Sequence, residues 1–256
     1  MHKLGLKLWS TNTDAYLREA ARLYANRVFD YLELYFVPGS LKTSDEWHAL
    51  GIPMIVHAPH SAHAVNLAAR EKREDNLAVY ENVRRFADAL DAPKIVAHGG
   101  AFGELDEAIR QLNLIGDNRI LVENKPYLPI DRSAIRLVGS TPDEIGKILS
   151  ETGLGFCLDF GHMVASANAH KADWRDYLTR FLAFGPAMYH ISDMDMTSDV
   201  DQHWHFGKGT LPIGELMGHV PCDSIISIEV QRSFGMQLND FERDVAYLRL
   251  NEGDWR

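Results

Sequence analysis

Cysteines, long apolar runs and basic residues are all scarce in this sequence. Its two cysteines, Cys157 and Cys222, have no CxxC partner, which excludes a disulfide framework as the basis of the fold. No run approaches the ~20 apolar residues of a membrane span. The first residues, MHKLGLKLWSTNTDAY, lack the uninterrupted apolar stretch of a signal peptide. We therefore expect a soluble, cytoplasmic protein with no membrane partner.

Acidic residues outnumber basic ones. The chain has 26 lysines and arginines against 36 aspartates and glutamates, so its formal net charge is −10. This balance argues against a broad basic surface for nucleic acid or anionic lipid, but a metal-lined groove is still compatible with it because bound ions add positive charge. The hydrophobic content of 46% is enough for a sizeable core. With no linker or break in composition, we expect residues 1–256 to form one domain.

Strand-length apolar runs alternate with helical patterns along the chain. The apolar runs span residues 4–9, 31–36, 54–58, 94–98, 119–124, 154–160, 187–192 and 225–230. The helical patterns include residues 13–27, 76–91, 105–116, 141–152, 173–185 and 238–250. Strands that start about every 32 residues predict an α/β fold, a single (β/α)₈ TIM barrel. A doubly wound open sheet is the second choice, because no GxGxxG follows the first strand.

Histidines and carboxylates gather at the predicted strand ends, where a TIM barrel carries its functional groups. The set comprises Glu33, His57, His60, His98, Glu123, Asp159, His162, His190, Asp193, Asp201, His203, His205 and Glu229. Carboxylates inside a barrel are costly to bury unless they are paired or bound to metal, and Lys125 and Lys208 are the obvious local cations. Imidazoles and carboxylates together suit Zn²⁺, Mn²⁺ or Fe²⁺, so the sequence predicts a divalent-metal site.

These motifs, in this order, resemble those of endonuclease IV, within the xylose-isomerase-like TIM barrel superfamily. The resemblance rests on VHAPHSAHAVNL, VAHGG, LVEN, CLDFGH, YHISD, DQHWHFGKG and IEV. It implies up to three zinc ions. The first would be held by His60, His98 and Glu123, the second by Glu123, Asp159, His190 and Glu229, and the third by His162, Asp201 and His203.

The first functional hypothesis is hydrolysis of a phosphoester, with abasic DNA, a nucleotide or a sugar phosphate as substrate. Multinuclear metal sites activate water and stabilise a leaving oxygen. The predicted catalytic residues are Glu123 and Glu229, and the predicted substrate contacts are Glu33, His57, Lys125, His205 and Lys208. Two loops argue against DNA: residues 60–64 hold no bulky side chain to wedge into a duplex, and residues 37–47 hold no arginine.

The alternative hypothesis is isomerisation or epimerisation of a sugar or sugar phosphate. It needs only one Mn²⁺, Co²⁺ or Zn²⁺, held by Glu123, Asp159, His190 and Glu229, with the two glutamates moving protons. Glu33 resembles the sugar-isomerase relatives more than endonuclease IV. A third hypothesis is a former enzyme kept as a non-catalytic metal-binding or interaction module. It is disfavoured because such a protein should lose metal ligands first, and every position of the endonuclease IV ligand pattern is still filled by a ligand residue type. The substrate, the number of ions and the oligomeric state stay open at this stage.

Overall fold

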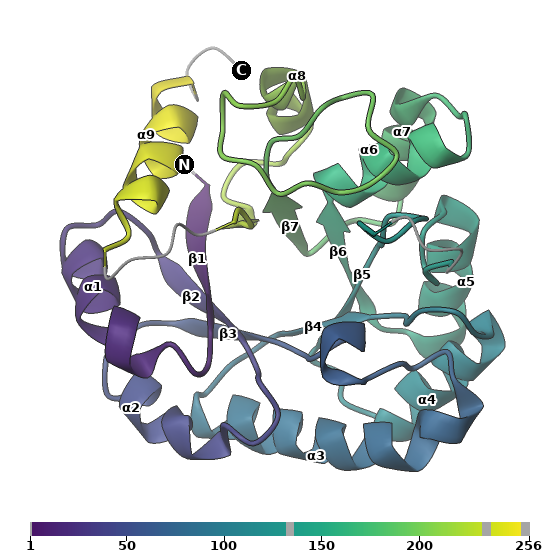
Figure 1. The fold of residues 1–256 in the computed structure, drawn as a ribbon, viewed down its shortest axis with the longest axis horizontal. Helices are drawn as coiled ribbons and strands as arrows, with labels where there is room; N and C mark the ends of the chain where they lie inside the picture. Colours follow the sequence, from purple (N-terminus) through teal and green to yellow (C-terminus); the bar gives the residue numbers. More distant parts are fainter. Residues whose placement is uncertain (1, 132–135, 232–236, 252–256) are drawn as a thin grey trace.

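The chain folds into a closed barrel of eight parallel strands in the order β1 to β8 (Figure 1). The computed structural model describes residues 2–131, 136–231 and 237–251. The strands are β1 Lys3–Trp9, β2 Tyr31–Tyr35, β3 Met54–His57, β4 Ile95–His98, β5 Ile120–Glu123, β6 Gly155–Asp159, β7 Met188–Ile191 and β8 Ile225–Ile228. Each strand falls within its predicted run or begins one residue before it. The predicted (β/α)₈ TIM barrel is therefore confirmed.

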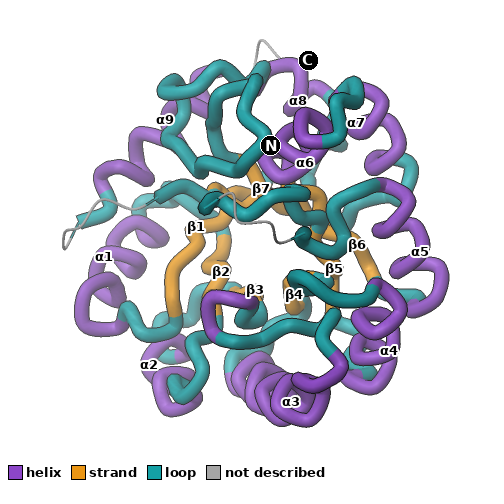
Figure 2. Tube along the Cα trace, turned by 45° about the vertical axis from the view of Figure 1, so that its right-hand side comes forward, coloured by secondary structure: helices purple, strands orange, loops and turns teal. Residues whose placement is uncertain are grey.

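Helices form a ring outside the strands (Figure 2). They are α1 Thr13–Ala25, α2 Ser44–His48, α3 Arg73–Ala89, α4 Leu105–Ile115, α5 Pro142–Thr152, α6 Phe160–Ala169, α7 Trp174–Leu182, α8 Ile213–Gly218 and α9 Asn239–Asn251. Short 3₁₀ turns occupy Leu41–Thr43, Ser61–His63 and Arg70–Lys72. The Thr141 side chain caps α5 by accepting a hydrogen bond from the Glu144 N–H, and Pro142 takes the first helical position.

Helix α6 has no counterpart among the predicted helices. Every residue from Phe160 to Ala167 is buried. A helix covered on all sides shows no alternation of polar and apolar faces, so its sequence lacks the 3.6-residue period that marks a surface helix. The helix nevertheless positions the site, because it begins directly after β6 at Asp159.

The strand register sets the height of the functional side chains. His98 on β4 pairs with Glu123 on β5, and Asp159 on β6 pairs with His190 on β7. One layer of the barrel interior is apolar, and its residues are Tyr31, Ile55, Val96, Leu121, Cys157 and Met188. Neighbouring strands thus bring histidines and carboxylates to one level, at the carboxyl end of the barrel.

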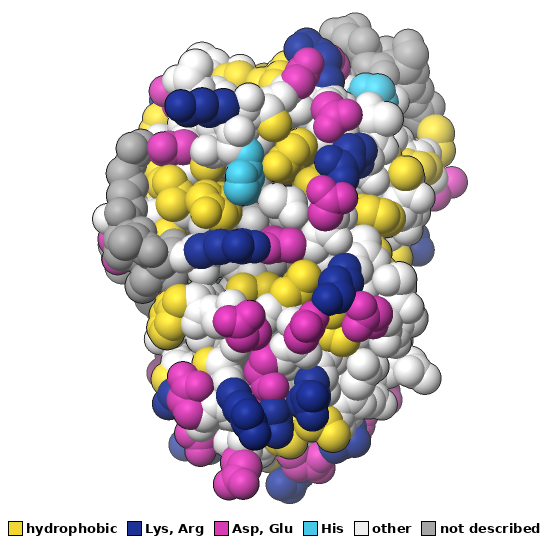
Figure 3. All heavy atoms as spheres, turned by 90° about the vertical axis from the view of Figure 1, so that its right-hand side faces the viewer, with side chains coloured by type: hydrophobic (Ala, Val, Ile, Leu, Met, Phe, Trp, Pro, Cys, Tyr) yellow, Lys and Arg dark blue, Asp and Glu magenta, His cyan; other side chains and the backbone are white. Residues whose placement is uncertain are grey.

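The outer surface carries mixed charge. On the face over α4, α5 and α7, acidic and basic side chains are interspersed (Figure 3). Lys147 lies 2.5 Å from Asp106, and Arg180 lies 2.6 Å from Asp143, so neighbouring helices are joined by exposed ion pairs. No helix in the described part of the chain has the length and apolar character to cross a membrane.

Candidate metal centre

Histidines and carboxylates converge at the carboxyl end of the barrel in three groups, and within each group the potential ligand atoms lie within 4.8 Å of one another. The groups are His57, His98 and Glu123; Glu123, Asp159, His190 and Glu229; and His162, Asp201 and His203. Glu123 belongs to two of them. Residues that follow different strands in the sequence therefore lie together in one continuous site.

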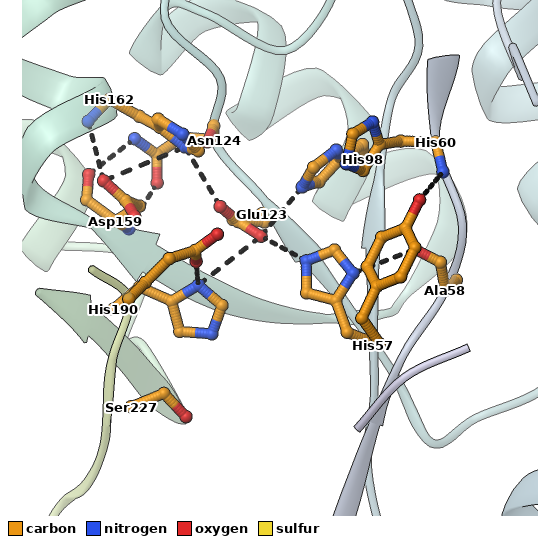
Figure 4. Close-up of polar contacts among 12 residues, drawn as sticks. His57, Ala58, His60, His98, Glu123, Asn124, Asp159, His162, His190 and Ser227 are labelled. Atoms are coloured by element: carbon orange, nitrogen blue, oxygen red, sulfur yellow. Dashed lines mark hydrogen bonds and ion pairs between the residues drawn. The ribbon is translucent and has the colours of Figure 1, made fainter. Parts of the chain in front are cut away.

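Glu123 is the centre of this arrangement (Figure 4). Its Oε2 lies 2.9 Å from His98 Nε2, 3.2 Å from His57 Nε2 and 3.6 Å from His190 Nδ1. Its Oε1 lies 3.0 Å from His162 Nδ1. A fully buried carboxylate among four imidazoles is placed to bridge two cations.

The third group depends on the long loop between β7 and α8. Asp201 and His203 lie on this loop, and His203 Nε2 contacts Asp201 Oδ2. His162, from the first turn of α6, brings its Nε2 to 3.5 Å from the same carboxylate oxygen. His203 adopts a positive φ of 50°, an unusual backbone conformation for a non-glycine residue.

Backbone carbonyls orient three of the imidazoles. In each ring Nδ1 lies within hydrogen-bond distance of a carbonyl oxygen, and the pairs are His57 with Ala58 (2.8 Å), His162 with Asn124 (2.8 Å) and His203 with Glu229 (2.7 Å). A ring that donates through Nδ1–H keeps Nε2 unprotonated and available as a metal ligand. This second layer of contacts is typical of histidines that bind metal.

Buried polar atoms without hydrogen bonds point into the groups. At the site these atoms include Glu123 Oε1, Asp159 Oδ2, His190 Nδ1, Asp201 Oδ1 and Glu229 Oε2. Three of them still face an ion-pair partner: Glu123 Oε1 faces His162, His190 Nδ1 faces Glu229, and Glu229 Oε2 faces Lys7. Among the described residues, Asp159 Oδ2 and Asp201 Oδ1 have neither a hydrogen bond nor an ion pair, and an unsatisfied buried carboxylate oxygen is costly, so both atoms fit a cation-binding site. The donor set of imidazole nitrogens and carboxylate oxygens therefore fits divalent metal ions.

The electrostatics of the site couple these side chains. Burial opposes the charge on Glu123, but the neighbouring His98 and His190 outweigh burial and hold its pKa well below the usual range. Burial also opposes protonation of His162 and His203. Asp159 and Asp201 together outweigh burial at His162 and raise that pKa to about 10, and Asp201 raises the pKa of His203 to about 9. Protons therefore compete with cations for these imidazoles.

Asn124 joins β5 to β6 beneath the ligands. Its Nδ2 donates to the Asp159 carbonyl oxygen at 2.9 Å, and its Oδ1 accepts from the Asp159 N–H at 2.8 Å. Asp159 in turn caps α6, because its Oδ1 accepts from the His162 N–H at 2.6 Å. Asp159 Oδ2 is left for a cation. Asn124 was not predicted as a site residue, although its place directly after Glu123 was a signal.

Asp193 anchors the loop that carries Asp201 and His203. Its Oδ2 accepts hydrogen bonds of 2.9 Å from the N–H groups of Gly207 and Gly209, and its Oδ1 accepts from Met194 at 2.9 Å. Asp193 and Trp204 also exchange two backbone hydrogen bonds. Sequence analysis noted Asp193 as a strand-end carboxylate but gave it no role.

A cavity of about 280 Å³ opens above the groups. Its lining includes His60, His98, Lys125, His162, Asp201, His203 and Glu229. The His60 ring stacks on His98 with 4.9 Å between centroids, so His60, predicted as a ligand, lies beside the first group, whereas His57 is a member of it. His57, predicted as a substrate contact, thus occupies a potential ligand position.

Two predicted substrate contacts lie elsewhere. His205 Nδ1 is 2.8 Å from Asp244 Oδ2 on α9, and His205 does not line the cavity. Lys208 is exposed on the loop between β7 and α8, also outside the cavity lining.

Lys7 and Glu33 lie deeper in the barrel. The Lys7 Nζ is 2.6 Å from Glu229 Oε2 and 3.3 Å from Glu33 Oε1. Glu33 is fully buried. Burial opposes its charge, but His190 and Lys7 outweigh burial and lower its pKa to about 2. Lys7 is therefore part of the charged interior, a role that the sequence analysis did not assign to it.

The sequence and the fold have counterparts among known proteins. A probable endonuclease 4 from Thermoplasma volcanium is 25% identical over 227 residues, which cover 81% of this chain and 76% of that protein. The crystal structure of a D-tagatose 3-epimerase-like protein shares 20% identity with a TM-score of 0.76, covering 99% of this chain and 98% of the other. Endonuclease IV from Thermus thermophilus also shares 20% identity, with a TM-score of 0.69 and coverage of 98% and 99%.

A model of the Xylose isomerase-like TIM barrel family matches residues 29–250, from two residues before β2 to the last but one residue of α9. The chain belongs to the Xylose isomerase-like TIM barrel family.

Proposed function

We propose that this protein is a divalent-metal-dependent enzyme that hydrolyses a phosphoester. The observation that carries the proposal is the third group, His162, Asp201 and His203, beside two groups that share Glu123. A single-metal isomerase has no use for a second and third set of ligands. Three adjacent groups instead suit a substrate whose several oxygens need neutralisation at once.

The ligand assignment follows the groups. His98 and Glu123, with His57 or His60, would hold one ion; Glu123, Asp159, His190 and Glu229 would hold another; and His162, Asp201 and His203 would hold the third. Zinc suits these ligands best, and manganese or cobalt suits them too. When bound, the ions would supply Lewis-acid activation of water and charge neutralisation at the phosphoryl group.

The protein's own residues position the reactants. Glu123 and Glu229 are the proposed catalytic residues, because Glu123 belongs to two groups and Glu229 lines the cavity, so that their carboxylates would orient an attacking water while holding metal. Lys125 lines the cavity and provides a cation for a phosphate oxygen. Pro126, Pro129, Ile130 and Leu137 form an apolar wall.

The cavity favours a small substrate. A volume of about 280 Å³ admits a nucleotide fragment or a sugar phosphate more readily than a duplex. The turn at Ser61–His63 presents no bulky apolar side chain to a base stack. The name of the curated relative, probable endonuclease 4, supports phosphoester chemistry, and the cavity points to a small-molecule ester rather than DNA.

A sugar isomerase or epimerase is the second candidate. One observation favours it: Glu123, Asp159, His190 and Glu229 alone form a complete four-ligand set with two glutamates. The name of one structural neighbour, a D-tagatose 3-epimerase-like protein, points the same way. In such a reaction Glu123 and Glu229 of this chain would exchange protons with a carbon and an oxygen of the substrate.

Metal content separates the two candidates. Elemental analysis of unchelated protein should find two or three ions per chain, and His203→Asn should lose one of them together with the hydrolysis of model phosphoesters. Asn tolerates the left-handed backbone at this position, so the fold should be kept. His219→Asn, at an exposed histidine, is the control. One ion per chain, unchanged by His203→Asn, with isomerisation of a sugar, would establish the second candidate.

A further inference from the structure

Below the metal groups, the barrel interior holds a layer of charged and hydroxyl side chains with no role in the proposed reaction. Glu33, on β2, is its centre. Its Oε1 faces Lys7 Nζ at 3.3 Å, and its Oε2 accepts a hydrogen bond from the Ser227 hydroxyl. The Tyr31 hydroxyl lies 2.8 Å from Ser227 Oγ and closes the layer.

His190 links this layer to the metal groups. Its Nε2 lies 2.9 Å from Glu33 Oε2, and its Nδ1 faces Glu229 Oε2 at 2.8 Å and Glu123 Oε2 at 3.6 Å. His57, His162 and His203 are oriented by backbone carbonyls through Nδ1. The His190 ring has the opposite orientation, because the atom held by a neighbouring group is Nε2 and that group is the Glu33 carboxylate.

We propose that Glu33 is the positioning residue for His190: it accepts the Nε2–H and thereby leaves Nδ1 unprotonated and aimed at the cation of the second group. The inference rests on the metal site of the proposed function. A carboxylate partner fixes the ring's tautomer and orientation and makes the ligand nitrogen more basic. Glu33 then acts through His190 and does not contact the substrate.

The burial of Glu33 supports this role. Its side chain is 0% exposed, and it is not among the residues that line the cavity. Lys7, which also contacts Glu229, compensates the charge of Glu33 within the barrel.

The test is metal affinity, measured without any substrate. In Glu33→Gln, an isosteric change, the affinity of the second group for zinc should be about 10- to 100-fold lower. Competition with a chromophoric chelator measures this affinity. Tyr31→Phe is the matched control, because it alters the same layer and leaves the Glu33–His190 contact intact. Its zinc affinity should equal that of the wild type.

A second measurement uses the wild-type protein and so does not depend on the folding of a variant. Nitrogen NMR of the zinc-loaded chain should show the His190 proton on Nε2, whereas a proton on Nδ1 would overturn the proposal. Unchanged zinc affinity in Glu33→Gln with a raised KM would also overturn it and would make Glu33 a substrate contact. A wild-type protein that binds no ion in the second group would instead refute the proposed function itself.

Discussion

The N–H of Gly209 donates a 2.9 Å hydrogen bond to Oδ2 of Asp193, and no side chain fits at position 209. A Cβ there would overlap the Met194 carbonyl oxygen and Asp193 Oδ1. The same carboxylate accepts from Gly207. One buried aspartate thus holds together the two ends of the loop that carries Asp201 and His203.

Gly209→Ala should therefore displace this loop. We expect a loss of about 1–3 kcal/mol in the free energy of unfolding from the steric overlap, together with weaker binding of the ion in the third group. Urea unfolding and metal analysis check the two effects. Gly185→Ala is the control for steric overlap, since Gly185 has open space around it, although unlike Gly209 it has a positive φ (65°). Full metal content in Gly209→Ala would show that Asp193 does not position the third group.

Glu123→Gln should have the widest effect of any single change. Glu123 belongs to two groups, so losing its charge should release ions from both and lower activity more than about 100-fold. Metal analysis and a phosphoester assay measure these losses. Glu151→Gln, at an exposed helix position, should change neither. Retained activity in Glu123→Gln would refute the whole site assignment.

Lys125→Met tests the cavity as the substrate site. Loss of a charge-assisted contact to a phosphate should weaken substrate binding by about 1.5–3 kcal/mol, which is roughly 10- to 100-fold in KM, with no change in metal content. Lys208→Met should leave KM unchanged, because Lys208 lies outside the cavity lining. Steady-state kinetics with a phosphorylated substrate checks both variants. Equal effects of the two substitutions would contradict the assignment.

The chelated protein should lose stability as the pH rises. The pKa of His203 is raised from 6.5 to about 9, chiefly by Asp201 against the effect of burial. A raised pKa contributes stability that is complete below the unfolded value and disappears as the pH passes the folded value. The free energy of unfolding should therefore fall between pH 6.5 and about 9.

Urea unfolding across this range, with chelator and then with zinc, measures the effect. In the zinc-loaded protein His203 would be a neutral ligand, so its share of the pH dependence should vanish. His203→Asn should flatten the curve of the chelated protein. A stability that rises with pH in the chelated wild type would contradict this prediction.

Local sequence patterns were sufficient to predict the strands and most of the long helices. Apolar runs bounded by Gly, Pro, Asp or Asn mark each strand, and the 3.6-residue period marks α1, α3, α4, α5, α7 and α9. Helix α6 was not predicted, because a helix buried on all sides lacks this period. The resemblance to endonuclease IV supplied the predicted ligand set, which stays a prediction, and the sequence did not reveal which atoms of these residues meet.

The sequence by itself determined which chemical groups stand at the strand ends, because strand period and residue type are local properties. The tertiary structure decided what each group does. Closure of the barrel brought Glu33 from β2 to His190 on β7, and it placed Lys7 between Glu33 and Glu229. Ring orientation, burial and the neighbour of each carboxylate depend on strands far apart in the chain, and so the roles of these residues emerge only when the barrel is closed.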